Sequence, residues 1–86
     1  MKKKNILVVD DERSIVEIWK EVFEALGHEV STAHNGDNGV KLIKETDFDL
    51  ILTDMKMPGS DGTVILDHVA NIEKNPKLIL SSGYIQ

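Results

Sequence analysis

The sequence predicts an α/β fold built on a parallel β-sheet, and three observations support this prediction. Short, largely apolar runs that contain β-branched residues occur at residues 6–9, 50–53 and 78–80. Segments whose apolar residues recur at helical spacing lie between these runs, and the connections are short. Strands that alternate with helices in this way form a parallel sheet joined by right-handed crossovers.

The first run, residues 6–9, is continuously apolar, which is typical of a strand buried on both faces. A helix is expected after it, because apolar residues then recur at helical spacing. These residues are Ile15, Trp19, Val22 and Leu26, with Ile18 and Phe23 beside them. We expect this stripe to face the sheet, with Trp19 in the core. Ser14 or Asp11 can cap the start of the helix, and Gly27 can provide its left-handed stop.

The rest of the chain predicts two more strand–helix units and a fourth strand. Residues 29–33 mix polar and apolar side chains, which favours a strand at the sheet edge. A helix is expected from Asp37 to Glu45, and the run 50–53 is a buried strand that ends in Asp54. A loop with Pro58 and Gly59 then leads to a third helix, which Asp61 can cap and which ends at Asn75-Pro76, and residues 78–80 form the last strand.

Composition limits the possible functions. The chain has 86 residues, which is one domain at most, and 15 acidic against 10 basic residues give a net charge of −5. That charge argues against direct binding to nucleic acid, which needs a cationic surface. The chain has no cysteine, so disulfides, thiol nucleophiles and thiolate metal sites are excluded. No apolar run approaches the roughly 20 residues that span a bilayer, so we expect a cytoplasmic protein without membrane association.

Acidic and hydroxyl side chains follow the predicted strands where each strand ends. Parallel strands end at the same edge of a sheet, so Asp10, Asp11, Asp54, Ser81 and Ser82 should gather there. Carboxylates that lie close together repel one another, so the pKa of at least one of them rises or a cation binds between them. Oxygen ligands favour Mg²⁺ as that cation. A carboxylate in such a site can also attack a phosphoryl group. The alternative is that these acids only stabilise a helix start and a strand end.

The motifs at these strand ends resemble the receiver domain of two-component response regulators. They are Val-Val-Asp-Asp-Glu at residues 8–12, Thr-Asp-Met-Lys-Met-Pro-Gly at 53–59, Asp-Gly at 61–62 and Leu-Ser-Ser-Gly-Tyr at 80–84. The resemblance implies that Asp54 accepts a phosphoryl group from the phosphohistidine of a sensor histidine kinase. It implies that Asp11 binds Mg²⁺, that Asp10 does so through water, and that the Lys56 carbonyl is a further ligand. Ser82 matches the hydroxyl residue that bonds the phosphoryl group in the active state.

The resemblance also implies a flavodoxin-like sheet with strand order 2-1-3-4. Residues 1–86 would be the amino-terminal portion of a receiver domain, without the family's fifth strand and last helices. The lysine on that fifth strand has no counterpart here, and the Lys56 side chain could partly replace it. Because the fourth strand would be uncovered, we expect a homodimer or a domain-swapped oligomer through it.

Two other interpretations stay open. A phosphatase of the haloacid dehalogenase type also uses an aspartate at a strand end, but it has a second aspartate where this chain has Lys56. A receiver-like module could instead bind partners without phosphorylation. On the main interpretation the protein is no conventional enzyme, and it catalyses only its own phosphorylation and dephosphorylation at Asp54. His28, His34 and His68 lack metal-ligand spacing, and we expect them to be ordinary, partly exposed side chains.

Overall fold

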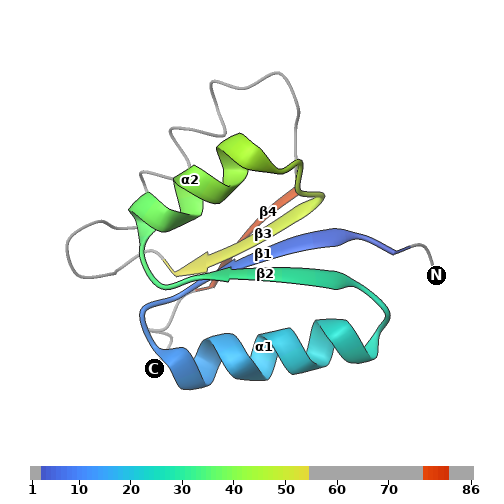
Figure 1. The fold of residues 1–86 in the computed structure, drawn as a ribbon. Coiled ribbons are helices and arrows are strands. Elements are labelled where there is room, and N and C mark those ends of the chain that lie inside the picture. The colour runs from blue at the N-terminus through green and yellow to red at the C-terminus, as the bar shows by residue number, and fades with distance from the viewer. Residues whose placement is uncertain (1–2, 55–76, 82–86) are drawn as a thin grey trace.

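The computed structural model describes residues 3–54 and the backbone of residues 77–81, and Figure 1 shows their arrangement. The strands are β1 (Asn5–Val9), β2 (Glu29–Ala33), β3 (Leu50–Asp54) and β4 (Lys77–Ser81). They pair in parallel in the order β2-β1-β3-β4. The predicted parallel α/β sheet is therefore confirmed, with β1 between β2 and β3 at its centre. The prediction that residues 29–33 form an edge strand is also confirmed.

The two described helices cover opposite faces of this sheet (Figure 1). They are α1 (Arg13–Ala25) and α2 (Gly36–Glu45). Side chains alternate between the faces of a strand, so each helix packs on its own apolar cluster. Ile6, Val8, Val16 and Leu52 form the cluster under α1, and Leu7, Val9, Ala33, Ile43, Phe48 and Ile51 form the cluster under α2. Both clusters contain residues of β1, which explains why this strand is apolar throughout.

The orientation of α1 differs from the sequence prediction. Val16 is fully buried and Phe23 is partly buried, so the line of contact with the sheet passes through these two residues. Four large residues of the predicted core stripe are exposed instead: Ile18, Trp19, Val22 and Leu26. Trp19 is not in the core; it stacks on Phe23 with ring centroids 5.7 Å apart. The prediction was wrong because apolar residues cover a wide arc of α1, so periodicity alone could not fix which part of the arc faces the sheet.

The predicted start of α1 was also wrong, whereas its end is confirmed. The residue at the N-cap is Glu12, and no side chain caps the helix, so neither Ser14 nor Asp11 has the expected role. Gly27 has φ of 93°, which is the left-handed conformation expected at the stop. The helix α2 does have a side-chain cap, because the Asn35 side chain accepts from the N–H of Asn38 at 2.8 Å.

Several predictions fall outside the described residues. These are the third helix, the site residues Lys56 and Ser82, and His68. His28 and His34 are partly buried, as expected of ordinary histidines. Among the helices that the structure describes, none is long and apolar enough to cross a membrane.

Candidate functional site

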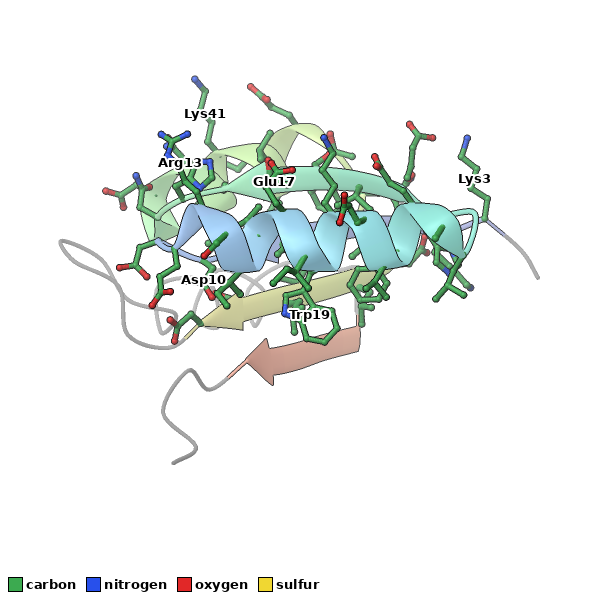
Figure 2. All side chains as sticks on the ribbon, turned by 90° about the horizontal axis from the view of Figure 1, so that it is seen from below. Lys3, Asp10, Arg13, Glu17, Trp19 and Lys41 are labelled. Atoms are coloured by element: carbon green, nitrogen blue, oxygen red, sulfur yellow. The ribbon has the colours of Figure 1, made fainter. Side chains whose placement is uncertain are left out.

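Three carboxylates meet at the edge of the sheet where β1 and β3 end. Asp10 follows the last residue of β1, and Asp54 is the last residue of β3. The register that pairs Val9 with Thr53 brings these two acids side by side. One oxygen of each of Asp10, Asp11 and Asp54 lies within 4.8 Å of the others. Figure 2 shows Asp10 at the end of the sheet to which the β3 arrow points. The predicted convergence of these acids is therefore what the structure shows.

The three acids differ in their environment. The side chains of Asp10 and Asp54 are buried, with 5% and 6% of their surface exposed, whereas Asp11 is exposed. Burial raises the pKa of Asp10, and the nearby carboxylates of Asp54 and Asp11 raise it further. A hydrogen bond from the backbone N–H of Glu12 opposes this shift. The three acids therefore concentrate negative charge at a partly desolvated site, and this charge favours the binding of a cation.

The position of Asp10 is fixed by two hydrogen bonds. Its N–H donates to the carbonyl of Ala33 on β2 at 3.1 Å. Its Oδ1 accepts from the N–H of Glu12, two residues on, at 3.0 Å. This local bond ties the carboxylate to the start of α1 and restricts its rotation. Sequence reasoning missed the part played by the Glu12 backbone; an aspartate two residues before a helix start was the available signal.

Thr53 and β4 fix the backbone of Asp54. Thr53 is fully buried, and its hydroxyl donates to the carbonyl of Asp54 at 3.1 Å. Asp54 is paired in register with Ser81 on β4. Since β3 is hydrogen-bonded on both sides, by β1 and β4, the backbone that carries Asp54 is firmly placed. Ser82 follows Ser81 in the sequence, and its position lies outside the described residues.

The donor set fits a hard divalent cation. Three carboxylates offer oxygen ligands within 4.8 Å of one another, and the chain has no thiolate. Carboxylate oxygens with water are the usual ligands of Mg²⁺, which keeps several waters in protein sites. A cation here would also relieve the repulsion that Asp10 experiences from its neighbours. The arrangement can therefore hold a metal beside a carboxylate whose backbone is fixed.

Comparison with protein families agrees with this arrangement. Residues 6–86 match the model of the response regulator receiver domain. Sporulation initiation phosphotransferase F of Bacillus subtilis is 36% identical over 84 residues, which are 98% of this chain and 68% of that protein. The transcriptional regulatory protein ResD of Bacillus subtilis is 34% identical over 77 residues, 90% of this chain. The chain spans only 32% of ResD, a much longer protein.

Comparison with solved structures gives the same result. Response regulator protein TrrA from Thermotoga maritima, solved in complex with Mg²⁺-BeF, has a TM-score of 0.87 and 38% identity. That match covers 95% of this chain and 71% of TrrA. TrrA in complex with the histidine kinase ThkA matches with a TM-score of 0.85 and 37% identity, over 96% of this chain and 72% of that chain. Both matches therefore cover nearly all of the chain.

Proposed function

The chain belongs to the response regulator receiver domain family of two-component signalling, and from this premise we propose that Asp54 is its phosphoacceptor. The observation that carries the proposal is the convergence of Asp10, Asp11 and Asp54, whose oxygens lie within 4.8 Å of one another at the end of β1 and β3. A strand-end carboxylate that lies beside two others is suited to accept a phosphoryl group next to a cation.

Mg²⁺ is the cofactor that this site would hold. Asp11 and Asp54 would be direct ligands, Asp10 would bind through water, and the Lys56 carbonyl would complete the protein ligands. The oxygen-only donor set and the relative crystallised with Mg²⁺-BeF support this assignment. When bound, Mg²⁺ supplies positive charge that stabilises the transferring phosphoryl oxygens.

The chain's own residues carry out the transfer. A carboxylate oxygen of Asp54 attacks the phosphorus of a phosphohistidine, a P–O bond forms, and the P–N bond breaks with its electron pair left on the imidazole. Thr53 and the flanking strands fix the Asp54 backbone for in-line attack. The Glu12 N–H holds Asp10 in place beside it. The Ser82 hydroxyl would then bond the phosphoryl group and report phosphorylation.

The phosphodonor is a sensor histidine kinase. The relative TrrA was crystallised with the histidine kinase ThkA, which supports a partner of this class. We infer a cytoplasmic location, because the receiver must meet a phosphohistidine that the kinase forms from ATP. For residues 1–86 we propose a single receiver unit with a third helix between β3 and β4.

Beryllofluoride, which mimics a phosphoryl group on aspartate, tests the site. The protein is titrated with beryllofluoride in the presence and absence of Mg²⁺, and ¹⁹F NMR detects fluoride bound to protein. We expect a bound signal that needs both Mg²⁺ and Asp54 and is lost in Asp54→Asn. Asp37→Asn, a change at an exposed acid on α2, is the matched control and should keep the signal. A Mg²⁺-dependent signal that survives Asp54→Asn would contradict the assignment. No signal in any variant would favour a receiver-like module that binds partners without phosphorylation.

A second activity, self-association, is favoured by one observation. Exposed apolar side chains line one side of α1: Ile18, Trp19, Val22 and Leu26, with exposed fractions between 36% and 54%. Trp19 projects from α1 on the side of β3 and β4 (Figure 2). We propose that a second copy covers this apolar side together with β4, as a homodimer or a domain-swapped oligomer. Large exposed apolar patches usually mark such interfaces.

Sedimentation velocity tests self-association. At roughly tens of micromolar, a concentration at which an interface of modest size is occupied, we expect a dimer or larger species. Val22→Glu should shift the protein to monomer, because a charge would be buried in the interface. Glu21→Gln, a neighbouring change on the polar side of α1, should leave the oligomer unchanged. A monomeric wild-type protein under these conditions would overturn the proposal.

A further inference from the structure

The outer edge of the sheet is formed by β2, which has no partner strand on its outer side among the described residues. The N–H of Glu29 and the C=O of Ala33 bond to the β1 side at 2.9 and 3.1 Å. Because backbone groups alternate between the two sides of a strand, those of Val30 and Thr32 point away from β1. The outer side of β2 therefore presents donors and acceptors that a further strand could use.

A groove of about 350 Å³ lies between this edge and α2. Ala33 and Leu42 provide apolar walls, and Asn38 adds an amide. His34 also lines the groove, and among the described residues its buried Nδ1 has no hydrogen-bond partner. The groove thus combines apolar contact with polar side chains.

Two opposite charges also line the groove. Lys41 and Glu45 contribute to its wall from α2, and neither forms an ion pair within the described part of the chain. They are one helical turn apart, which is about 6 Å along the axis. Side chains on one face of an extended strand repeat every two residues, about 6.6 Å. The spacing of the two charges therefore fits two side chains on the same face of an extended peptide.

We propose that the β2 edge and this groove bind an extended peptide segment of another protein as an added strand. The peptide backbone would pair with Val30 and Thr32. Two side chains of opposite charge, two residues apart, would enter the groove, the acidic one at Lys41 and the basic one at Glu45. This site is separate from the phosphoacceptor residues and does not depend on phosphorylation.

Two labelled peptides test the charge pattern. Their sequences are Thr-Val-Lys-Val-Glu-Val-Thr and Thr-Val-Glu-Val-Lys-Val-Thr, and fluorescence anisotropy measures their affinity without Mg²⁺ or phosphodonor. We expect the protein to bind one of the two peptides with roughly fivefold higher affinity than the other, which is the effect expected of exposed ion pairs. The double variant Lys41→Glu/Glu45→Lys should reverse this preference. Lys44→Glu, an exposed change on the same helix outside the groove, should keep it.

A second measurement tests the backbone pairing. Thr32→Pro removes an outward N–H from β2, whereas Thr32→Val keeps it, so only the proline variant should lose at least tenfold in affinity. Peptides that are N-methylated at alternate amides give the same test on the ligand side if the proline variant does not fold. Absence of binding by both peptides, an unchanged preference in the charge-swapped variant, or equal binding of the N-methylated peptides would overturn the proposal.

Discussion

At the scale of single residues, the site depends on a carboxylate that folding removes from water. Asp10 is buried next to Asp54 and Asp11, and burial is the larger cause of its raised pKa. The sequence predicted that these acids would meet, because strand ends converge in a parallel sheet. It could not predict which acid would be buried, since that depends on how the chain turns from β1 into α1. The bond from the Glu12 N–H to Asp10 arises in the same turn.

We predict that Asp10→Asn stabilises the protein at pH 7 when divalent cations are removed. A raised pKa means that the folded state binds a proton more tightly than the unfolded state. Stability is therefore lost as pH rises from the ordinary value of 3.8 through the raised pKa. Asparagine removes this charge and keeps an oxygen that can accept from Glu12.

Thermal unfolding followed by circular dichroism measures this effect. With a chelator at pH 7, the Tm of Asp10→Asn should exceed that of the wild type by roughly 2–5 °C, a change that corresponds to less than about 1 kcal/mol in a domain of this size. The difference should shrink as the pH falls towards 4, where the wild-type carboxyl is increasingly protonated. A variant less stable than the wild type at pH 7 would argue that the charge of Asp10 is compensated within the fold.

Gly27 gives a second prediction at this scale. An added Cβ at this position would meet no atom within 4 Å, so the effect of a substitution is confined to the backbone. At φ of 93°, Gly27→Ala should lower the free energy of unfolding by about 1–2 kcal/mol. Gly27→Asn should lower it less, because asparagine tolerates the left-handed region. Urea denaturation measures both; equal stability of Gly27→Ala and the wild type would show that the stop of α1 does not need this conformation.

At the scale of elements, the sequence predicts where a helix forms better than it predicts which side of the helix faces the sheet. The spacing of apolar residues predicted α1 and α2, and α2 begins and ends within one residue of the expected range. The rotation of α1 was mispredicted because its apolar residues cover about half of the helix surface. Only packing against the sheet selects Val16 and Phe23 as the contact line. The remaining apolar side, which includes Trp19, stays exposed.

Two valines on α1 test this orientation. Val16→Ala should lower the free energy of unfolding by about 2 kcal/mol, because it leaves a cavity under the helix. Val22→Ala, the same change at a residue 43% exposed, should change it by less than about 0.5 kcal/mol in dilute monomer. Urea denaturation measures both variants. The reverse order of effects would mean that α1 packs through the stripe predicted from the sequence.

At the scale of the whole molecule, the alternation of strands and helices predicted a parallel sheet and the edge at which the site forms. The strand order came from the family resemblance, because alternation alone does not choose among orders. The groove beside β2 was not predicted, since it arises only when α2 folds back and brings Lys41 beside His34. The sheet and the edge where its strands end were thus predictable, whereas the groove between α2 and β2 needed the folded structure.

Mg²⁺ should stabilise the whole fold through the three acids. A ligand that binds only the folded state adds about 1.4 kcal/mol at a concentration ten times its Kd. We therefore expect Tm to rise with millimolar MgCl₂ in the wild type and to stay constant in Asp11→Asn. Glu21→Gln removes an exposed acid elsewhere on α1 and should respond as the wild type does. Equal responses of wild type and Asp11→Asn would show that Mg²⁺ acts only through general screening.

The most direct test of the central claim is phosphorylation itself. The protein is incubated with a phosphorylated histidine kinase or a small acyl phosphate, with and without Mg²⁺, and intact-mass spectrometry followed by digestion locates the modification. We predict the addition of one phosphoryl group, on Asp54, that requires Mg²⁺ and is absent in Asp54→Asn. A phosphoryl group found on another residue, or one that forms equally well without Mg²⁺, would contradict the claim that these carboxylates make a phosphoacceptor site.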